Sequence, residues 1–192
     1  MFLLQSITDH AKMISNNFNK TASISKKITS IALLASLAAI LQSAGGFVPI
    51  VGLFISPFAT APVIISTILS ARYGWIGYLL TTLLLILIQP SEVIIFVFTT
   101  GLLGIGIGYA FHLWKRRLSL IIAGSLFLLS GIIMVLFIFQ FPLLGPSIHS
   151  SASTPFLLAL GVFSFLYSWL WVEISILVLK RLKSFSFYEI GR

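Results

Sequence analysis

Long apolar segments, separated by short polar or proline-containing stretches, constrain this chain more than any other feature of its sequence. An α-helix of about 20 apolar residues crosses the ~30 Å hydrocarbon layer of a bilayer. The sequence therefore predicts an all-α, polytopic membrane protein with six transmembrane helices. The predicted spans are residues 28–44, 47–71, 74–89, 92–113, 118–141 and 155–179, within a membrane domain of residues 28–180.

The composition supports the same class of protein. Of 192 residues, 58% are hydrophobic and only 8% are charged, which leaves too little polar surface to cover a water-soluble core. The net charge of +8 does not indicate a nucleic-acid partner, because the basic residues flank apolar spans and lack stacking aromatic neighbours. The absence of cysteine excludes disulfides and thiolate chemistry.

The basic residues fall into alternate connections between the predicted spans. Residues 45–57, 89–92 and 142–154 contain no Lys or Arg. Short cytoplasmic loops collect Lys and Arg, so six spans with both termini in the cytoplasm place every basic residue on one side. These residues are Lys12, Lys20, Lys26, Lys27, Arg72, Lys115, Arg116, Arg117, Lys180, Arg181, Lys183 and Arg192.

Two polar segments flank the membrane domain, and one span is irregular. In residues 1–27, apolar side chains recur at three- and four-residue steps, which fits either an interfacial helix or a cytoplasmic tail with coincidental spacing. Residues 181–192 form the predicted cytoplasmic tail. Three prolines within residues 47–62 predict a re-entrant loop or a broken helix before the second span.

The first span contains two rows of small residues with four-residue spacing. Ala32 and Ser36 form one row, and Ala35 and Ala39 form the other. Such rows let two helices approach closely inside a membrane. Packing within the protein and docking of a partner protein are both compatible with this pattern.

The fourth span carries a Gly-x-x-x-Gly spacing at Gly104 and Gly108. Because no strand precedes these glycines and no Lys-Ser/Thr pair follows them, we interpret them as helix-packing residues rather than as a phosphate-binding loop.

Several polar residues occur near the predicted external ends of the spans. Together they could hold a small polar molecule, although solvation of helix ends explains any one of them alone. The candidate ligand-binding residues are Gln42, Gln89, Glu92, Gln140, His149 and Tyr167.

The two acidic residues near the hydrocarbon layer each have two interpretations. Glu92 fits a counter-ion for a ligand or a charge stabilised at a helix N-terminus. Glu173 fits a buried functional group or a carboxylate near the inner interface that pairs with Arg72 or a basic residue of the tail.

Catalytic and metal-binding patterns are missing from the sequence. In the predicted topology His10, His112 and His149 do not converge on one site, and neither a His-Glu-x-x-His nor a Gly-x-Ser-x-Gly motif occurs. We therefore expect no enzyme activity, no metal site and no cofactor.

The run from Ile31 to Ile40 resembles the first helix of the S components of energy-coupling-factor (ECF) vitamin transporters. In those helices an Ala-x-x-x-Ala motif docks on the membrane coupling subunit, and Ala32 and Ser36 match its spacing with Ser in the second place. The stretch from Gly101 to Tyr109, followed by Lys115, Arg116 and Arg117, is similar to the end of the fourth span in the same superfamily and in its S-component-like bacterial relatives.

This resemblance implies a substrate-binding subunit in the bacterial cytoplasmic membrane. Its partners would be the lipid bilayer, a small-molecule ligand such as a vitamin or precursor, an ECF coupling membrane subunit and ATPases. The ligand motifs of the thiamine-, riboflavin- and biotin-binding members have no clear match here. The alternative hypothesis is a membrane scaffold or assembly protein without transport activity.

The charge pattern yields a direct test of orientation. Alkaline phosphatase, which is active only outside the cytoplasm, is expected to be active when fused after Ser150 and inactive when fused after Arg116. Both fusions would be assayed in a bacterial host at matched expression. Inactive enzyme at Ser150 would contradict the topology.

Overall fold

The structure, a computed structural model, describes residues 8–48, 50–139 and 154–190, with side-chain surroundings from Ala11 to Arg181 within these ranges. Helices make up nearly all of this part of the chain. They are α1 (Thr8–Thr21), α2 (Ile24–Phe47), α3 (Val51–Ile55), η2 (Ser56–Ala59), α4 (Thr60–Leu69), α5 (Ala71–Ile88), α6 (Ser91–Ile95), η3 (Phe96–Thr100), α7 (Gly101–Leu113), α8 (Arg117–Ile133), η4 (Met134–Ile138) and α9 (Thr154–Ile190). The segment η2 is a 3-10 helix, whereas η3 and η4 are π-helical.

Six helical stretches are long and apolar enough to cross a membrane, so the prediction of an all-α, multi-pass membrane protein is confirmed. They are Ile24–Phe47, Val51–Leu69, Ala71–Ile88, Ser91–Leu113, Arg117–Ile138 and Thr154–Arg181. The first begins before residue 28 because the Ser23 side chain caps it by accepting a hydrogen bond from the Lys26 N–H group at 3.4 Å. Helix α9 continues through most of the predicted tail of residues 181–192.

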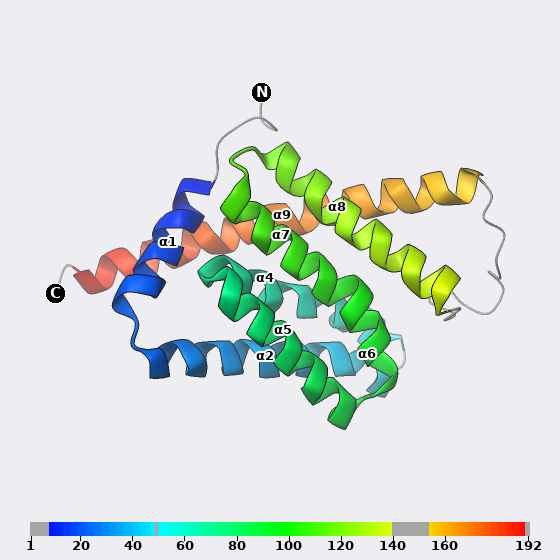
Figure 1. The fold of residues 1–192 in the computed structure, drawn as a ribbon, viewed down its shortest axis with the longest axis horizontal. Coiled ribbons are helices and arrows are strands. Elements are labelled where there is room, and N and C mark those ends of the chain that lie inside the picture. The colour runs from blue at the N-terminus through cyan, green and yellow to red at the C-terminus, as the bar shows by residue number, and fades with distance from the viewer. Residues whose placement is uncertain (1–7, 49, 140–153, 191–192) are drawn as a thin grey trace.

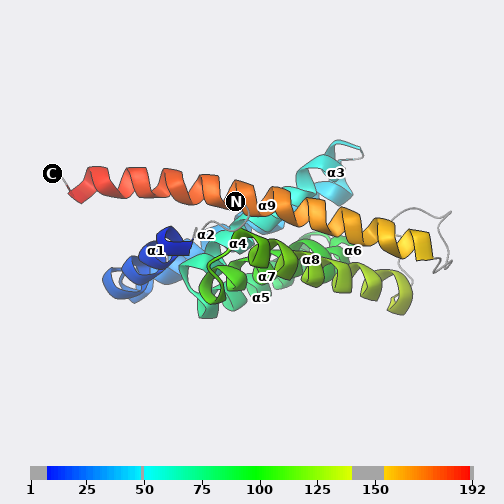
Figure 2. The same ribbon diagram turned by 90° about the horizontal axis from the view of Figure 1, so that it is seen from above.

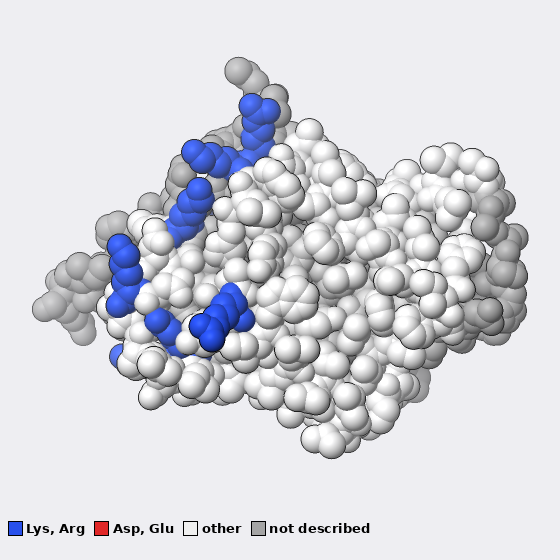
Figure 3. All heavy atoms as spheres, viewed as in Figure 1, with Lys and Arg blue, Asp and Glu red and all other residues white. Residues whose placement is uncertain are grey.

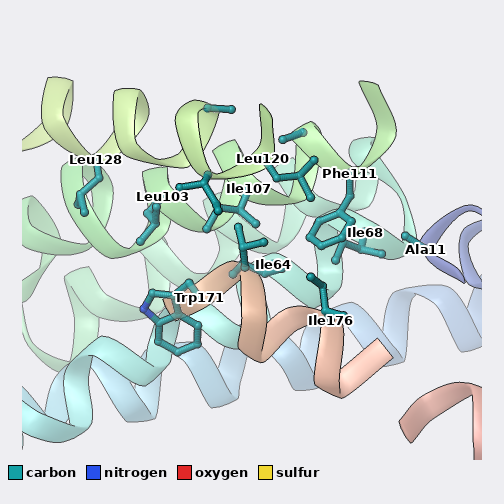
Figure 4. Close-up of a cluster of buried hydrophobic side chains, with 14 of the residues drawn as sticks. Ala11, Ile64, Ile68, Leu103, Ile107, Phe111, Leu120, Leu128, Trp171 and Ile176 are labelled. Atoms are coloured by element: carbon teal, nitrogen blue, oxygen red, sulfur yellow. The ribbon is translucent and has the colours of Figure 1, made fainter. Parts of the chain in front are cut away.

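Helices α4 and α7 form the centre of the bundle (Figure 1). Helices α2 and α5 pack on one side of this pair, α8 packs beside α7, and α9 runs along the length of the bundle (Figures 1 and 2). Side chains from α4, α7, α8 and α9 meet in one buried apolar cluster, in which Ile64, Leu103, Ile107, Leu120 and Trp171 point toward one another (Figure 4).

The described Lys and Arg residues gather at one end of the bundle, which we term the basic end (Figure 3). This end comprises α1, the start of α2, the α4–α5 and α7–α8 connections, and α9 near Lys180 and Arg181. The opposite end carries α3, α6 and the start of α9, and we term it the uncharged end because no described Lys or Arg lies there (Figures 1 and 2). Its acidic residue Glu92, in α6, is buried. Between the two ends, large apolar side chains such as Leu33, Leu79, Leu126 and Leu166 are exposed on the outer faces, as expected for a surface in contact with lipid.

The proline-rich segment forms an interrupted helix. A short helix, α3, passes into the 3-10 helix η2, which holds Pro57 near its start, and then directly into α4. Of the two predicted alternatives for residues 47–62, the structure shows the broken helix. Pro57 has no N–H group to donate, and the tighter turn accommodates this loss.

Helix α1 packs on the basic end of the bundle. The Ser15 hydroxyl donates a hydrogen bond to the Leu69 carbonyl oxygen at 3.0 Å, and the Asn19 amide donates to the same oxygen at 3.2 Å. Leu69 is the last residue of α4, so these two side chains satisfy a carbonyl that a helix end leaves without a partner. The Phe18 ring also meets the Tyr73 ring edge-on at 6.5 Å.

Glu173 pairs with Arg117 of α8. The Arg117 guanidinium donates to the two carboxylate oxygens at 3.0 and 3.3 Å, and the Arg117 side chain is only 6% exposed. Of the two interpretations of Glu173, this contact supports a carboxylate paired with a basic residue, and the partner among the described residues is Arg117 rather than Arg72. Residues 117 and 173 meet because the start of α8 packs beside the second half of α9.

Gly104 and Gly108 lie where α7 packs against α4. A Cβ atom at Gly104 would lie 2.7 Å from the Val63 Cβ atom, and one at Gly108 would collide with the Thr67 side chain. The Gly-x-x-x-Gly spacing thus forms a groove for α4, and both glycines are buried inside the chain's own bundle.

A closer contact between helices occurs at Gly131 of α8, where a Cβ atom would overlap the Phe98 carbonyl oxygen of η3. We expect Gly131→Ala to lower the free energy of unfolding by roughly 2–3 kcal/mol, because a backbone atom cannot move aside as a flexible side chain can. Thermal unfolding in detergent, followed by tryptophan fluorescence, would measure the loss.

Gly161 of α9 provides the matched control, because a Cβ atom there would have no atom within 4 Å. Gly161→Ala should be neutral or stabilising by up to ~1 kcal/mol through helix propensity. Equal stability of the two variants would show that α8 and η3 are not in close contact.

Candidate functional site

A cavity of about 280 Å³ lies among four segments of the chain: η2, the α6–η3 segment, α8 and α9. Its walls are mainly apolar, with a few hydroxyl groups, as is typical of small-molecule sites. The lining residues are Ser56, Pro57, Ile95, Thr99, Thr100, Leu128, Ile132, Leu160, Phe163 and Tyr167.

The π-helical segment η3 forms one wall of this cavity. The Gly101 N–H group bonds the Phe96 carbonyl five residues earlier, which widens the helix locally. Such π-helical turns inside α-helices are frequent at functional sites. Here the widened turn carries Thr99 and Thr100, which line the cavity.

A chain of buried hydrogen bonds leads from the cavity wall to Glu92. The Thr100 hydroxyl donates to the Gln42 Oε1 atom at 2.7 Å, and the Gln42 Nε2 atom donates to the Glu92 Oε2 atom at 2.8 Å. Gln42 is fully buried, and Glu92 is 7% exposed. Among the described residues no Lys or Arg pairs with Glu92, so Gln42 is the side chain that offsets the cost of burying this carboxyl group.

Two glycines at the end of α2 make room for this arrangement. A Cβ atom at Gly45 would lie 2.9 Å from the Glu92 Oε1 atom, and one at Gly46 would collide with the Gln89 side chain. The Gly45–Gly46 pair therefore lets the start of α6 lie close against α2. Glu92 is also in the first turn of α6, where the helix dipole favours an acidic group.

Aromatic rings form the opposite wall. The Phe163 and Tyr167 rings stack at a centroid distance of 5.6 Å and an interplanar angle of 23°. Tyr167 meets the Trp171 ring edge-on at 6.4 Å, and Trp171 in turn meets Phe58 at 6.0 Å. Of these rings, Phe163 and Tyr167 line the cavity and give it an apolar aromatic wall that suits a flat ligand.

Two buried polar groups beside Tyr167 have no hydrogen-bond partner among the described residues. They are the Thr60 hydroxyl and the Trp171 Nε1–H group, on side chains that are 0% and 3% exposed. Both lie near the Tyr167 hydroxyl, without the geometry of a normal hydrogen bond. Neither side chain lines the cavity, so the two form a buried polar cluster beside Tyr167.

The arrangement is suited to binding. The cavity offers apolar walls, a stacked ring pair and hydroxyl groups that donate or accept hydrogen bonds. Within the described ranges, no three His, Asp or Glu residues are placed to hold a metal ion. His112, near the basic end, is hydrogen-bonded to the Thr67 carbonyl oxygen at 2.8 Å.

The predicted ligand-binding residues occupy different places. Gln42 and Glu92 are in direct contact, and Tyr167 lines the cavity that Thr100 links to Gln42. Gln89 is half-buried and donates to the Ser91 hydroxyl at 3.1 Å, away from the cavity wall. Gln140 and His149 lie outside the described residues.

The two small-residue rows of α2 point in different directions. Ala35 and Ala39 are buried, and the Ala35 carbonyl accepts a hydrogen bond from the Thr81 hydroxyl of α5 at 3.2 Å. Ser36 is exposed and Ala32 is half-buried. The Ala32–Ser36 row therefore lies on the outer face of the bundle, and Ile40, one helical turn further on, is 63% exposed on the same face.

Four contributors to the site were not among the predicted residues: Thr60, Thr100, Trp171 and the Gly45–Gly46 pair. The adjacent glycines at the end of an apolar span were the one available signal for close approach of another segment. Thr60 and Thr100 resemble other hydroxyl residues of the spans in sequence, and only the packing distinguishes them.

The hydrogen-bond chain predicts a specific pattern of stability. Gln42→Leu removes both hydrogen bonds and leaves the Glu92 carboxyl group facing an apolar side chain, so we expect a loss of ~2–3 kcal/mol in unfolding free energy. Glu92→Gln retains an acceptor for the Gln42 amide and should cost less than ~1 kcal/mol.

The double variant Gln42→Leu/Glu92→Leu should regain part of the loss, because both polar partners are then apolar. Thermal unfolding of the wild type, Gln42→Leu, Glu92→Leu and the double variant in one detergent would give the coupling energy. Full stability of the Gln42→Leu variant would refute the buried chain.

Comparison of this chain with models of protein families, with curated proteins and with solved structures found no match.

Proposed function

We propose that this protein is a membrane-embedded, substrate-binding subunit that captures a small molecule for uptake by an ECF-type coupling module. The observation that carries the proposal is the cavity that has stacked aromatic rings on one side and, on the other, Thr100 at the end of the buried chain through Gln42 to Glu92. An ionisable group inside a membrane domain is costly and usually serves a function.

The orientation follows from charge. With the basic end in the cytoplasm of a bacterial cell, the uncharged end faces the outside. The cavity is lined by η2, α6 and the first part of α9, which belong to the half near the uncharged end. A binding subunit for uptake needs its site open to that side.

The cavity defines the class of ligand. Its volume of about 280 Å³ is at the small end of ligand sites, which favours a compact molecule with one or two rings. The Phe163–Tyr167 pair supports stacking, and the Thr100 hydroxyl on the cavity wall supplies a polar contact. A small heteroaromatic vitamin or precursor has this combination of a flat face and polar edges.

The outer row of α2 provides the docking surface for the coupling subunit. Ser36 and Ile40 are exposed, and the small side chains at Ala32 and Ser36 allow close approach of another helix in lipid. The energy for transport would come from the ATPases of the module, as the resemblance of α2 to S components implies.

A scaffold protein is the alternative function. Its two candidate surfaces, the glycine row of α7 and the apolar face of α1, are both used inside the bundle. Gly104 and Gly108 pack on α4, and Ala11 of α1 is buried in the core. These contacts favour the binding subunit over the scaffold.

The test combines the docking row with the ligand. Ser36→Trp should abolish co-purification with a co-expressed coupling subunit and its ATPases, because the indole blocks close approach of the helices. Ser130→Trp is the matched control: Ser130 is an exposed serine on α8, outside the row, and its variant should co-purify normally.

Mass spectrometry of small molecules released from the gently purified wild-type protein provides the second measurement. A released heteroaromatic molecule, retained in Ser36→Trp but lost in Tyr167→Ala, is expected. No coupling module bound to the wild-type protein and no released molecule would together overturn the proposal.

A further inference from the structure

A second hollow, of about 390 Å³, lies between α2 and α5 at the basic end. Both helices begin at this end, so the hollow runs from their first turns toward the middle of the bundle. We term it the α2–α5 groove. It is lined by Ile28, Ile31, Ala32, Arg72, Tyr73, Ile76 and Leu80.

The groove changes from polar to apolar along its length. Arg72 and Tyr73 lie in the first turn of α5, and Ile76 and Leu80 follow at four-residue steps on the same face. Arg72 and Leu80 are therefore separated by about 12 Å along the helix axis. The groove is open to the side, since Ile28 and Ile76 are 57% and 45% exposed.

Arg72 is the charged group of this groove, and it is exposed. It forms no hydrogen bond or ion pair with another described residue. Other basic residues of this end do have partners: Arg117 pairs with Glu173, and Lys27 donates to the Asn19 carbonyl at 2.7 Å. The Arg72 guanidinium is thus free to bind an anion through two parallel N–H···O hydrogen bonds, in bidentate geometry.

The start of α5 adds to the attraction for an anion. Its first turn has no acidic residue and no capping side chain, so its N–H groups and the positive end of the helix dipole are uncompensated by a described side chain. An anion at Arg72 would meet both the guanidinium and this helix end. The Tyr73 ring beside it is of the type that favours the headgroup level of a membrane.

Because the groove is basic at its mouth and apolar farther along, we propose that the α2–α5 groove binds one anionic phospholipid. Its phosphate lies at Arg72 and the start of α5, and an acyl chain lies along Ile76, Leu80 and Ile31. The lateral opening admits a lipid directly from the leaflet at the basic end. A soluble phosphate compound would use only the polar mouth and would leave the apolar part of the groove, at Ile31, Ile76 and Leu80, unfilled.

Native mass spectrometry of the full chain, titrated with phosphatidylglycerol or phosphatidylcholine of identical acyl chains, tests the proposal. One phosphatidylglycerol should be retained in preference to phosphatidylcholine. Arg72→Gln should weaken this retention about fivefold, the factor expected for one arginine at a lipid headgroup, whereas Arg72→Lys should retain most of it. Lys115→Gln, which removes the same charge from the α7–α8 connection, should have little effect.

The apolar part of the groove is tested separately on α5. Ile76→Trp places a large ring in the groove and should reduce binding, whereas Ile86→Trp, at a similarly exposed position outside the groove, should not. If Arg72→Gln fails to fold, the comparison of Ile76→Trp with Ile86→Trp still tests whether the groove binds the lipid. None of these variants changes a residue of the cavity or of the docking row, and Ala32, which belongs to both the docking row and the groove, is left as it is. Lipid retention and co-purification are separate measurements, so the lipid site and the proposed transport function can fail independently.

Three results would overturn the lipid site. One is equal retention of the two lipids by the wild-type protein. Another is equal loss of phosphatidylglycerol in Arg72→Gln and Lys115→Gln. The third is full competition by glycerol 3-phosphate, which would assign the mouth of the groove to a soluble phosphate compound.

Discussion

Backbone hydrogen bonding in the absence of water is the constraint on which this structure depends. A membrane span keeps its N–H and C=O groups paired internally, so departures from α-helical geometry are tolerated only where protein covers them. The departures at η2 and η3 follow this rule. Pro57 of η2 and Thr100 of η3 both line the cavity, so the irregular backbone lies against other helices of the bundle.

The same constraint applies to polar side chains. Each acidic residue of the described spans has a hydrogen-bonding partner from another helix, Arg117 for Glu173 and Gln42 for Glu92. The two pairs differ in chemistry. The pair at the basic end joins opposite charges and ties α8 to α9, whereas the pair near the uncharged end joins a carboxyl group to a neutral amide. The Gln42 amide can satisfy the Glu92 carboxyl group by hydrogen bonding but does not neutralise a charge on it.

Much of the fold could be predicted from the sequence, because six apolar segments of sufficient length have few alternatives to spanning a bilayer. The polar residues of the site were partly predictable for the same reason, since Gln42 and Glu92 stand out in apolar surroundings. Their contact was not, because fifty residues separate them and the rotation of each helix depends on packing. The partner of Glu173 could not be predicted for the same reason, because Arg117 is 56 residues away in sequence. The π-helical segment η3 was not predicted either, because a one-residue widening of a helix leaves no pattern in the sequence.

Helix α2 connects the two sites that the proposed function requires. It presents Gln42 to the buried chain on its inner side and Ser36 on its outer side, six residues and about 9 Å apart along one continuous helix. Helix α2 is unbroken between these positions, and the Thr81–Ala35 hydrogen bond holds it against α5. A ligand that displaced Gln42 from Thr100 would therefore change how α2 packs on the bundle. The position of the outer row at Ala32 and Ser36, which a partner would contact, would change with it. The coupling between cavity and docking surface then needs no chain of side-chain rearrangements, because one continuous helix carries both.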